Sequence, residues 1–254
     1  MPALIIPTAE PFFFPGDRIG CLLIHGFTGA PKEMLWMGEY LAAQGHSVLG
    51  IRLAGHATQP ADMLRMRWRD WVAGVEDGYH LLRRSTDHIF AIGLSMGGAL
   101  ALHHGAHHPV SGVIAMSAPY SLGADPRLPY AQYLQYIQPN IPKGPSDWQN
   151  PDAVADHVDY PYYPTRAIAE LRDLLVEVRA ALPEIQVPVL LVHSHKDGGV
   201  LPLNAEQIYS HLLAKDKTLL WVENSGHVIT REPDRQQVFE AAEAFIKRVI
   251  ASRA

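Results

Sequence analysis

The sequence predicts an α/β domain with a mostly parallel central sheet, helices on both faces and one inserted segment. Short apolar, β-branched runs alternate with longer amphipathic stretches, which is the pattern of strands joined by crossover helices. The runs are continuously apolar, as in strands that helices cover on both faces. A chain of 254 residues is also long enough to bury the core of such a domain.

The first part of the chain contains four strand candidates, each an apolar run that ends in polar, glycine or proline residues. They are residues 19–26 (IGCLLIHG), 46–53 (HSVLGIRL), 88–94 (HIFAIGL) and 111–119 (SGVIAMSAP), and residues 11–14 (PFFF) add a candidate antiparallel edge strand. The segments between them repeat apolar residues at helical spacing, so we expect helices at residues 31–45, 61–84 and 95–108.

This alternation stops at Pro119, after which proline and tyrosine accumulate before an amphipathic helix at residues 165–182. The apolar positions of that helix share one face: Ile168, Leu171, Leu175, Val178 and Leu182. The alternation then resumes with strands at residues 188–195 and 217–225 and helices at residues 204–214 and 235–252. We therefore expect a core of residues 1–118 and 184–254 and a lid of residues 119–183 over the carboxyl ends of the strands, where open α/β sheets bind ligands.

Composition and charge exclude several classes of function. The 21 basic and 26 acidic residues give a net charge of −5 without a basic cluster, so nucleic acid is not an expected partner. The single cysteine, Cys21, allows no internal disulfide. No signal-like start and no run of about eighteen apolar residues are present, so we expect a cytoplasmic protein without stable membrane insertion, as a monomer or homodimer.

The stretch Gly93-Leu94-Ser95-Met96-Gly97 lies where the strand at residues 88–94 passes into the next helix. In a Gly-x-Ser-x-Gly turn of this kind the serine sits on a strained bend and its hydroxyl is exposed at the sheet edge. The alternative is a serine that merely caps a helix. A base, an acid and an oxyanion site elsewhere in the chain would favour a nucleophile.

Two later strand ends supply an acid and a base in the order that follows such a serine. Asp197 comes after the strand at residues 188–195, and His227 follows the strand at residues 217–225. Ser95, Asp197 and His227 are thus the predicted triad. Asp125 is the competing acid, but it lies in a proline-bounded loop; His193 and His195 are competing bases, but they precede the acid.

An oxyanion hole needs two N–H donors directed at one point. Met96 supplies one at a helix N-terminus, and Phe27 would supply the other from the turn after the first core strand. We expect His25 to brace that turn by hydrogen bonding.

Four histidines, His103, His104, His107 and His108, raise the question of a metal site because pairs four apart share a helix face. No glutamate lies between the pairs and no third ligand is evident. We therefore predict no metal and no cofactor.

These residues lie in blocks that resemble bacterial α/β-hydrolases of the carboxylesterase and monoacylglycerol lipase group. The blocks are AEPFFF, LLIHGFTGAPKEM, RLAGHATQPADM, RDWVAGVEDGY, GLSMGG, HHP and SGHVIT. The resemblance spans nearly the whole chain and implies the α/β-hydrolase fold. It also implies the roles that chemistry assigns to the triad, Phe27 and Met96. The block LAGHAT differs from many relatives, which carry Pro and Gly in place of Ala54 and Ala57.

The lid offers side chains with apolar bodies and polar tips, which suit one acyl chain and a small polar head. They include Tyr130, Tyr133, Tyr136, Tyr162 and Tyr163, together with Ile137. Each could instead pack the lid onto the core. By resemblance, Asp156 lies near the position of an acidic lid residue in the lipases and could accept hydrogen bonds from glycerol hydroxyls. Ile137, Asp156 and Tyr163 are the predicted substrate contacts.

The predicted function is that of a serine carboxylic-ester hydrolase acting through an acyl-enzyme, with monoacylglycerols as the first choice of substrate. A broad-specificity carboxylesterase for short- to medium-chain esters is the alternative, and an acyltransferase sharing the acyl-enzyme is a further one. A binding module on the same fold usually lacks a triad member. Epoxide or haloalkane chemistry would require a carboxylate in place of Ser95.

Overall fold

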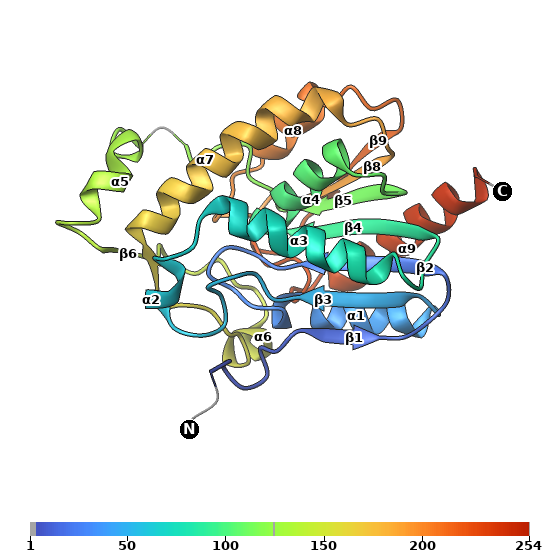
Figure 1. Ribbon diagram of the computed structural model, residues 1–254, viewed down its shortest axis with the longest axis horizontal. Helices are drawn as coiled ribbons and strands as arrows, with labels where there is room; N and C mark the ends of the chain where they lie inside the picture. The colour runs from blue at the N-terminus through green and yellow to red at the C-terminus, as the bar shows by residue number, and fades with distance from the viewer. Residues whose placement is uncertain (1–3, 124, 254) are drawn as a thin grey trace.

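The computed structural model describes residues 4–123 and 125–253, and its centre is a seven-stranded sheet with the order β1-β3-β2-β4-β5-β8-β9 (Figure 1). The strands are β1 (Phe12–Phe14), β2 (Ile19–Ile24), β3 (Ser47–Ile51), β4 (His88–Leu94), β5 (Gly112–Met116), β8 (Val189–Ser194) and β9 (Lys217–Val222). Neighbouring strands are parallel, except that β1 pairs antiparallel with β3. The predicted parallel sheet and its antiparallel edge strand are confirmed.

Both faces of the sheet are buried, because successive apolar side chains point to opposite sides. On β2, Leu22 and Ile24 belong to one core cluster and Cys21 and Leu23 to the other. This is why the strands read as continuous apolar runs in the sequence.

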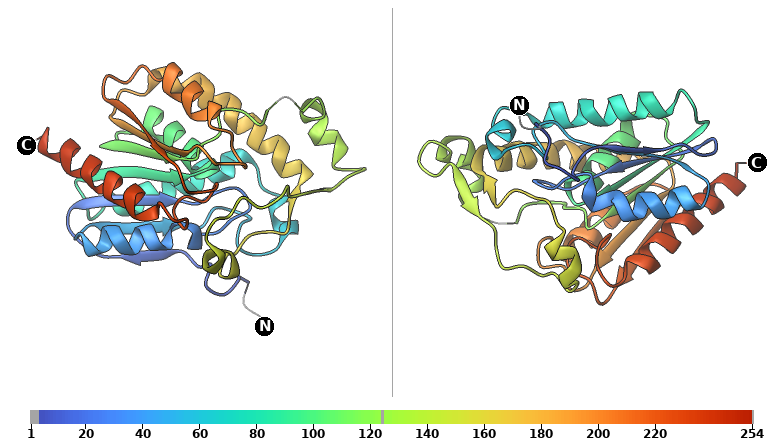
Figure 2. Two further views of the ribbon diagram at one scale, coloured as in Figure 1. Left: turned by 180° about the vertical axis from the view of Figure 1, so that it is seen from behind. Right: turned by 90° about the horizontal axis from the view of Figure 1, so that it is seen from below.

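Each face of the sheet is covered by its own set of helices (Figure 2). One face carries α3 (Trp68–Leu82), α4 (Met96–His107), α7 (Thr165–Ala181) and α8 (Leu203–His211), and the other carries α1 (Lys32–Ala43) and α9 (Arg235–Ala251). No helix within residues 4–123 or 125–253 combines the length and the apolar character that crossing a membrane requires.

The single helix predicted over residues 61–84 is wrong, because the structure has two helices there. A short helix, α2 (Pro60–Met63), ends before Arg67, and α3 begins at Trp68. Arg67 is extended, with φ −119° and ψ 158°, and its N–H donates to the Asp70 carboxylate at 2.7 Å. The aspartate three residues ahead thus stabilises a new helix N-terminus inside a stretch whose apolar spacing looks continuous.

The segment between β5 and β8 contains the short elements η1 (Leu128–Tyr130), α5 (Ala131–Leu134), β6 (Asn140–Pro142), α6 (Pro151–Ala155) and β7 (Tyr162–Pro164), then α7 and η2 (Leu182–Glu184). Strands β6 and β7 pair antiparallel. The apolar face of α7 joins the core beside α3 and α4, with Leu171, Leu175 and Val178 buried there. The part before α7 lies at the carboxyl ends of the parallel strands (Figure 1), where the Tyr160 N–H donates to the Thr28 carbonyl at 3.0 Å.

The strand order changes direction between β2 and β4. The chain leaves β2 for β3 on one side and returns to β4 on the other. At such a switch point the loops after the two strands diverge, and open α/β sheets bind ligands between them. Ile24 lies opposite Gly93 in the β2–β4 register, so the turn containing Phe27 begins beside the turn containing Ser95.

Candidate active site

Ser95 sits on a sharp turn between β4 and α4. Its backbone has φ 56° and ψ −122°, a strained conformation for a residue with a side chain. The turn needs glycine on both sides because the backbones cross closely. A Cβ on Gly93 would lie 2.0 Å from the Gly97 carbonyl oxygen, and one on Gly97 would lie 2.1 Å from that of Ile24. The sequence reading of this turn agrees with its geometry.

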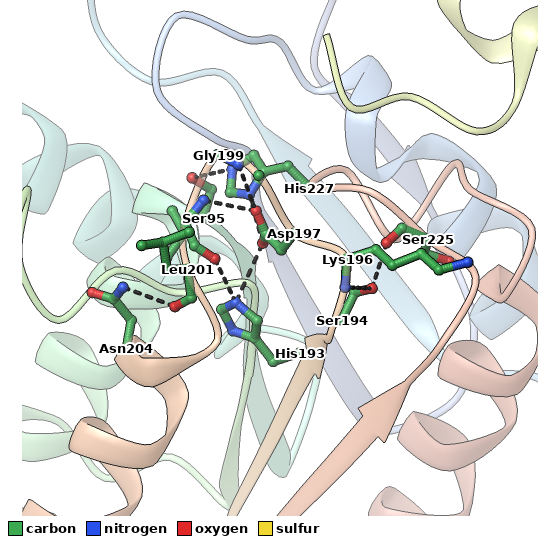
Figure 3. A network of polar contacts seen from close by, with 12 residues as sticks. Ser95, His193, Ser194, Lys196, Asp197, Gly199, Leu201, Asn204, Ser225 and His227 are labelled. Atoms are coloured by element: carbon green, nitrogen blue, oxygen red, sulfur yellow. Dashed lines mark hydrogen bonds and ion pairs between the residues drawn. The ribbon is translucent and has the colours of Figure 1, made fainter. Parts of the chain in front are cut away.

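Three side chains from three strand ends meet at this turn (Figure 3). His227 Nε2 lies 2.9 Å from Ser95 Oγ, and His227 Nδ1 lies 3.0 Å and 2.9 Å from the two carboxylate oxygens of Asp197. An imidazole in this position can take a proton from the serine hydroxyl while the carboxylate holds its tautomer. The structure therefore brings together all three residues of the predicted triad.

Asp197 is buried and well supplied with donors. Its Oδ1 accepts the backbone N–H groups of Gly199 at 2.9 Å and Val200 at 2.7 Å. Burial by itself would raise the pKa of Asp197, but the charge of His227 and hydrogen bonds from His193, His227 and Val200 hold that pKa below its usual range. The carboxylate stays ionised opposite the imidazole throughout the neutral pH range.

His193 occupies a different place from the one that a base would need. Figure 3 shows Asp197 between His193 and His227, with His193 Nε2 3.3 Å from Asp197 Oδ2 and 2.8 Å from the Val200 carbonyl oxygen. His193 is 1% exposed, and its Nε2–H donates to these acceptors. His193 thus contacts Asp197 on the side opposite His227 and helps to hold its carboxylate in position.

The environment of His227 favours its protonated form. Partial burial lowers the pKa of His227, but the charge and hydrogen bond of Asp197, with the charges of Asp147 and Glu33, outweigh burial and raise this pKa above 6.5. A base with a raised pKa accepts the serine proton more readily, although less of it is unprotonated at neutral pH.

Phe27 and Met96 each carry a backbone N–H on a turn that adjoins Ser95. Within the described residues, neither Phe27 N–H nor Met96 N–H donates to another protein group. A Cβ on Gly26 would lie 3.3 Å from Ser95 Cβ, so the Phe27 turn abuts the serine, and Met96 is the first residue of α4. Two N–H groups without a protein acceptor, on turns that adjoin Ser95, could serve as donors to a developing oxyanion.

The Phe27 turn is braced from below by His25 and Glu33. His25 Nδ1 lies 2.9 Å from the Gly26 carbonyl oxygen, and its Nε2 accepts the Leu53 N–H at 3.1 Å. Burial lowers the pKa of His25 to about 4, so the ring is neutral and the predicted bracing role agrees with these contacts.

Glu33 is a site residue that sequence reasoning missed. Its Oε2 accepts the Gly26 N–H at 2.8 Å, and burial raises its pKa to about 7. A Cβ on Gly29 would lie 2.1 Å from Glu33 Oε1, so the glycine after Thr28 leaves room for this carboxylate. The one signal in the sequence is that Glu33 follows Gly29 by four residues, in the first turn of a helix. Exposed glutamates are also common in the first turn of helices, so this signal does not identify a site residue.

The three residues between β5 and β8 that are predicted to contact substrate lie in different surroundings. Tyr163 stacks on Phe27, with ring centroids 5.8 Å apart. Ile137 is 85% exposed. Asp156 pairs with Lys32 and with Arg231, whose Nη2 donates at 2.8 Å. Of these three residues, Tyr163 packs against the Phe27 turn, whereas Ile137 is exposed to solvent and Asp156 is held in ion pairs.

The competing candidates lie elsewhere. Asp125 forms an ion pair with Arg127, and His195 stacks on Trp221 with ring centroids 4.3 Å apart. On α4, His103 stacks on His107 and His104 on His108. Among residues 4–123 and 125–253, no group of three or more histidine, cysteine or acidic side chains could hold a metal ion.

Comparison with known proteins assigns the family. A family model described as "Serine aminopeptidase, S33" matches residues 17–234. The chain belongs to this family. A thermostable monoacylglycerol lipase of Bacillus sp. (strain H-257) is 34% identical to this chain over 96% of both chains. A carboxylesterase of Bacillus subtilis is 30% identical over 96% of this chain and 98% of that protein.

Solved structures of lipolytic enzymes have the same fold as this chain. A structure from the work on the metagenome-derived lipolytic enzymes LipS and LipT superimposes with a TM-score of 0.91, at 34% identity, over 96% of this chain and 99% of that one. A monoacylglycerol lipase of Paleococcus ferrophilus has a TM-score of 0.79 at 19% identity, over 94% and 98% of the two chains. The predicted α/β-hydrolase fold and the predicted class are confirmed: the protein is a serine hydrolase of carboxylic esters.

Proposed function

We propose that Ser95 is the nucleophile of this esterase, His227 its general base and acid, and Asp197 the carboxylate that orients His227. The observation that carries the proposal is the chain of contacts from Ser95 Oγ through His227 to Asp197, with each step at 2.9 to 3.0 Å. Phe27 and Met96 are proposed as the oxyanion donors, each worth roughly 10²- to 10³-fold in rate.

The reaction follows from these positions. Ser95 Oγ attacks the ester carbonyl carbon while His227 Nε2 takes its proton, and the carbonyl electrons move to the oxygen that faces Phe27 N–H and Met96 N–H. When the tetrahedral intermediate collapses, the bond to the alcohol breaks and His227 gives the alcohol its proton. Water then attacks the acyl-enzyme while His227 takes one of its protons; when the second intermediate collapses, the acid leaves and His227 returns that proton to Ser95 Oγ.

Monoacylglycerols are the proposed substrates. The relative with 34% identity is a monoacylglycerol lipase, and the stacked rings of Phe27 and Tyr163 offer an apolar surface on the turn next to Ser95. Tyr163, Ile137 and Asp156 remain the lid residues we propose as substrate contacts. The alternative, a carboxylesterase of broad specificity, is favoured by the relative with 30% identity that carries that name.

Narrower features accompany this proposal. We place the lid at residues 119–183 between core segments 1–118 and 184–254, and we place the enzyme in the cytoplasm as a monomer or homodimer that binds no nucleic acid. The buried free thiol of Cys21 is compatible with a reducing compartment.

A matched ester series tests the proposal. We would measure kcat/KM for 1-monolauroylglycerol, dilauroylglycerol, methyl laurate and p-nitrophenyl laurate, with lauroyl p-nitroanilide as the amide control and Ser95→Ala as the blank. A monoacylglycerol lipase prefers the monoglyceride to the methyl ester because the lid recognises the glycerol. Equal or better turnover of the methyl ester would contradict the substrate assignment, and cleavage of the anilide at comparable rates would contradict the ester preference.

A further inference from the structure

Asp147 lies between β6 and α6 in the inserted segment, residues 119–183, which is called the insertion below. Its carboxylate reaches the loops that carry Asp197 and His227. Its Oδ2 accepts two backbone N–H groups, from Gly198 at 2.9 Å and from His227 at 2.8 Å. These donors are 51 and 80 residues away in sequence. One oxygen of the insertion therefore connects the residue after the acid with the backbone of the base itself.

The insertion packs closely against the loop that carries His227 and makes ordinary contact with the loop that carries Asp197. A Cβ on Gly226 would lie 2.3 Å from the Asp147 carbonyl oxygen, and a Cβ on Gly198 would lie 3.4 Å from Asp147 Cβ. Glycine stands on both loops where the insertion approaches them. A side chain at Gly226 would push the two backbones apart.

The rest of this segment is attached to the loop after β9 as well. The Gln149 N–H donates to Glu232 Oε2 at 3.0 Å, and the Asn150 amide donates to the Arg231 carbonyl oxygen at 2.8 Å. Glu232 is fully buried and also accepts the Gly226 N–H at 3.3 Å. These contacts hold residues 147–150 in place, so that the Asp147 carboxylate has a fixed position.

We propose that Asp147 is a positioning residue that sets the separation of Asp197 and His227, so that the insertion takes part in catalysis and does not only cover the site. This inference rests on the proposed roles of Asp197 and His227. A carboxylate is suited to the task because its one oxygen can accept both N–H groups, and charge-assisted hydrogen bonds of this kind are about twice as strong as neutral ones.

The negative charge of Asp147 has a second effect. The charged groups that face His227 are Asp197 from the loop after β8, Glu33 from α1 and Asp147 from the insertion, and all three raise the pKa of His227 against the effect of burial. Asp197 and Glu33 remain in an Asp147 variant. Removing the charge of Asp147 alone therefore lowers the pKa of His227 without abolishing the ion pair.

Two substitutions at Asp147 separate its geometric role from its charge. Asp147→Asn keeps an acceptor oxygen and removes the charge, whereas Asp147→Ala removes both. Asp152→Asn, an exposed position five residues along the same segment, is the matched control. For each protein we would measure kcat and KM on p-nitrophenyl butyrate between about pH 5 and pH 9, together with the Tm.

We expect Asp147→Ala to lower kcat by roughly 10- to 100-fold, because small displacements of catalytic groups have effects of that size, with KM changed by less than about 3-fold. Asp147→Asn should restore most of kcat and shift the acidic limb of the kcat/KM profile to lower pH. Asp152→Asn should match the unaltered protein. These effects should appear at temperatures well below the Tm of every variant.

Unchanged kcat and an unchanged pH profile in Asp147→Ala would overturn the inference. So would a fall in Tm with no change in the kcat of the folded fraction, because that result indicates a structural contact only. Ser95→Ala separates this test from the proposed function. If Ser95→Ala is inactive while the Asp147 variants behave like the unaltered protein, only the role of Asp147 is wrong; if Ser95→Ala is active, the proposed function is wrong.

Discussion

The strand-end loops and the inserted segment meet at His227 and Phe27, and they are built differently. Each residue of the proposed triad follows a strand of the central sheet, and Asp197 is 2% exposed. The insertion before α7 consists of short elements and leaves Tyr136 84% and Ile137 85% exposed. A sheet fixes the positions of its strand ends by backbone hydrogen bonding, whereas short elements depend on a few side-chain anchors. Reaction chemistry should therefore depend on the loops, with Asp147 as the contribution of the insertion to it, and substrate selection should depend on the rest of the insertion.

The largest expected effect comes from the strand-end side. Ser95→Ala should lower kcat by about 10⁴- to 10⁶-fold and leave the fold intact, because the acyl-enzyme cannot form. Stopped assays with p-nitrophenyl butyrate and a circular dichroism spectrum measure this effect, with Ser85→Ala at an exposed position as the control. Activity in Ser95→Ala within about a hundredfold of the unaltered protein would show that the reaction does not depend on the strand-end serine.

Asp197→Asn should follow, with a fall in kcat of about 10⁴-fold, because the amide favours the wrong imidazole tautomer. The Nε2–H of His193 lies near Asp197 Oδ2. In the variant it would face either the oxygen or the N–H group of the new amide. Steady-state kinetics of Asp197→Asn and Asp125→Asn distinguish the two candidate acids. A larger loss in Asp125→Asn would contradict the assignment.

The pH dependence tests the electrostatics of the same loops. His227 must be neutral to take the serine proton, and its pKa is raised above 6.5. We therefore expect kcat/KM to rise with pH through a midpoint above 6.5, and the fraction of active base to be lost as pH falls below it. A midpoint below that value in a full pH–rate profile would show that burial dominates over the surrounding carboxylates.

On the insertion side, Tyr163→Ala should change selectivity more than chemistry. Loss of the ring that stacks on Phe27 removes apolar contact, so we expect kcat/KM for monolauroylglycerol to fall by about 10-fold and that for p-nitrophenyl butyrate by less than about 3-fold. Tyr136→Ala, whose side chain is exposed, is the matched control. An equal fall in kcat/KM for both esters would mean that Tyr163 supports the catalytic geometry. It would then contradict the expectation that this part of the insertion acts on substrate selection.

The smallest expected effect is on the thermal stability of the protein and comes from Glu33, which is buried next to the Phe27 turn. Glu33 has its pKa raised to about 7 in the folded protein, from 4.5, so its charge opposes folding increasingly as the pH rises through that interval. Glu33→Gln should therefore gain in Tm relative to the unaltered protein between about pH 5 and pH 8, by a few degrees. A difference in Tm that is constant or shrinks with rising pH would contradict this account.

The sequence predicted local features well and distant contacts poorly. Gly93, Ser95 and Gly97 could be interpreted because a strand, a turn and a helix follow one another within a few residues. Asp147 could not be found, because its partners lie 51 and 80 residues away and an aspartate in a proline-rich loop has no pattern of its own. The helix break at Arg67 was missed for the opposite reason, because apolar spacing outweighed a local capping contact with Asp70.

Covalent trapping tests the central claim most directly. The protein is incubated with a p-nitrophenyl alkylphosphonate, which a serine nucleophile attacks with loss of p-nitrophenol, and the adduct is located by mass spectrometry of its peptides. We predict one adduct per chain, on Ser95, that forms in step with the loss of esterase activity and is absent in Ser95→Ala. Full inactivation with the label on another residue, or full labelling of Ser95 with activity retained, would contradict the proposed active site.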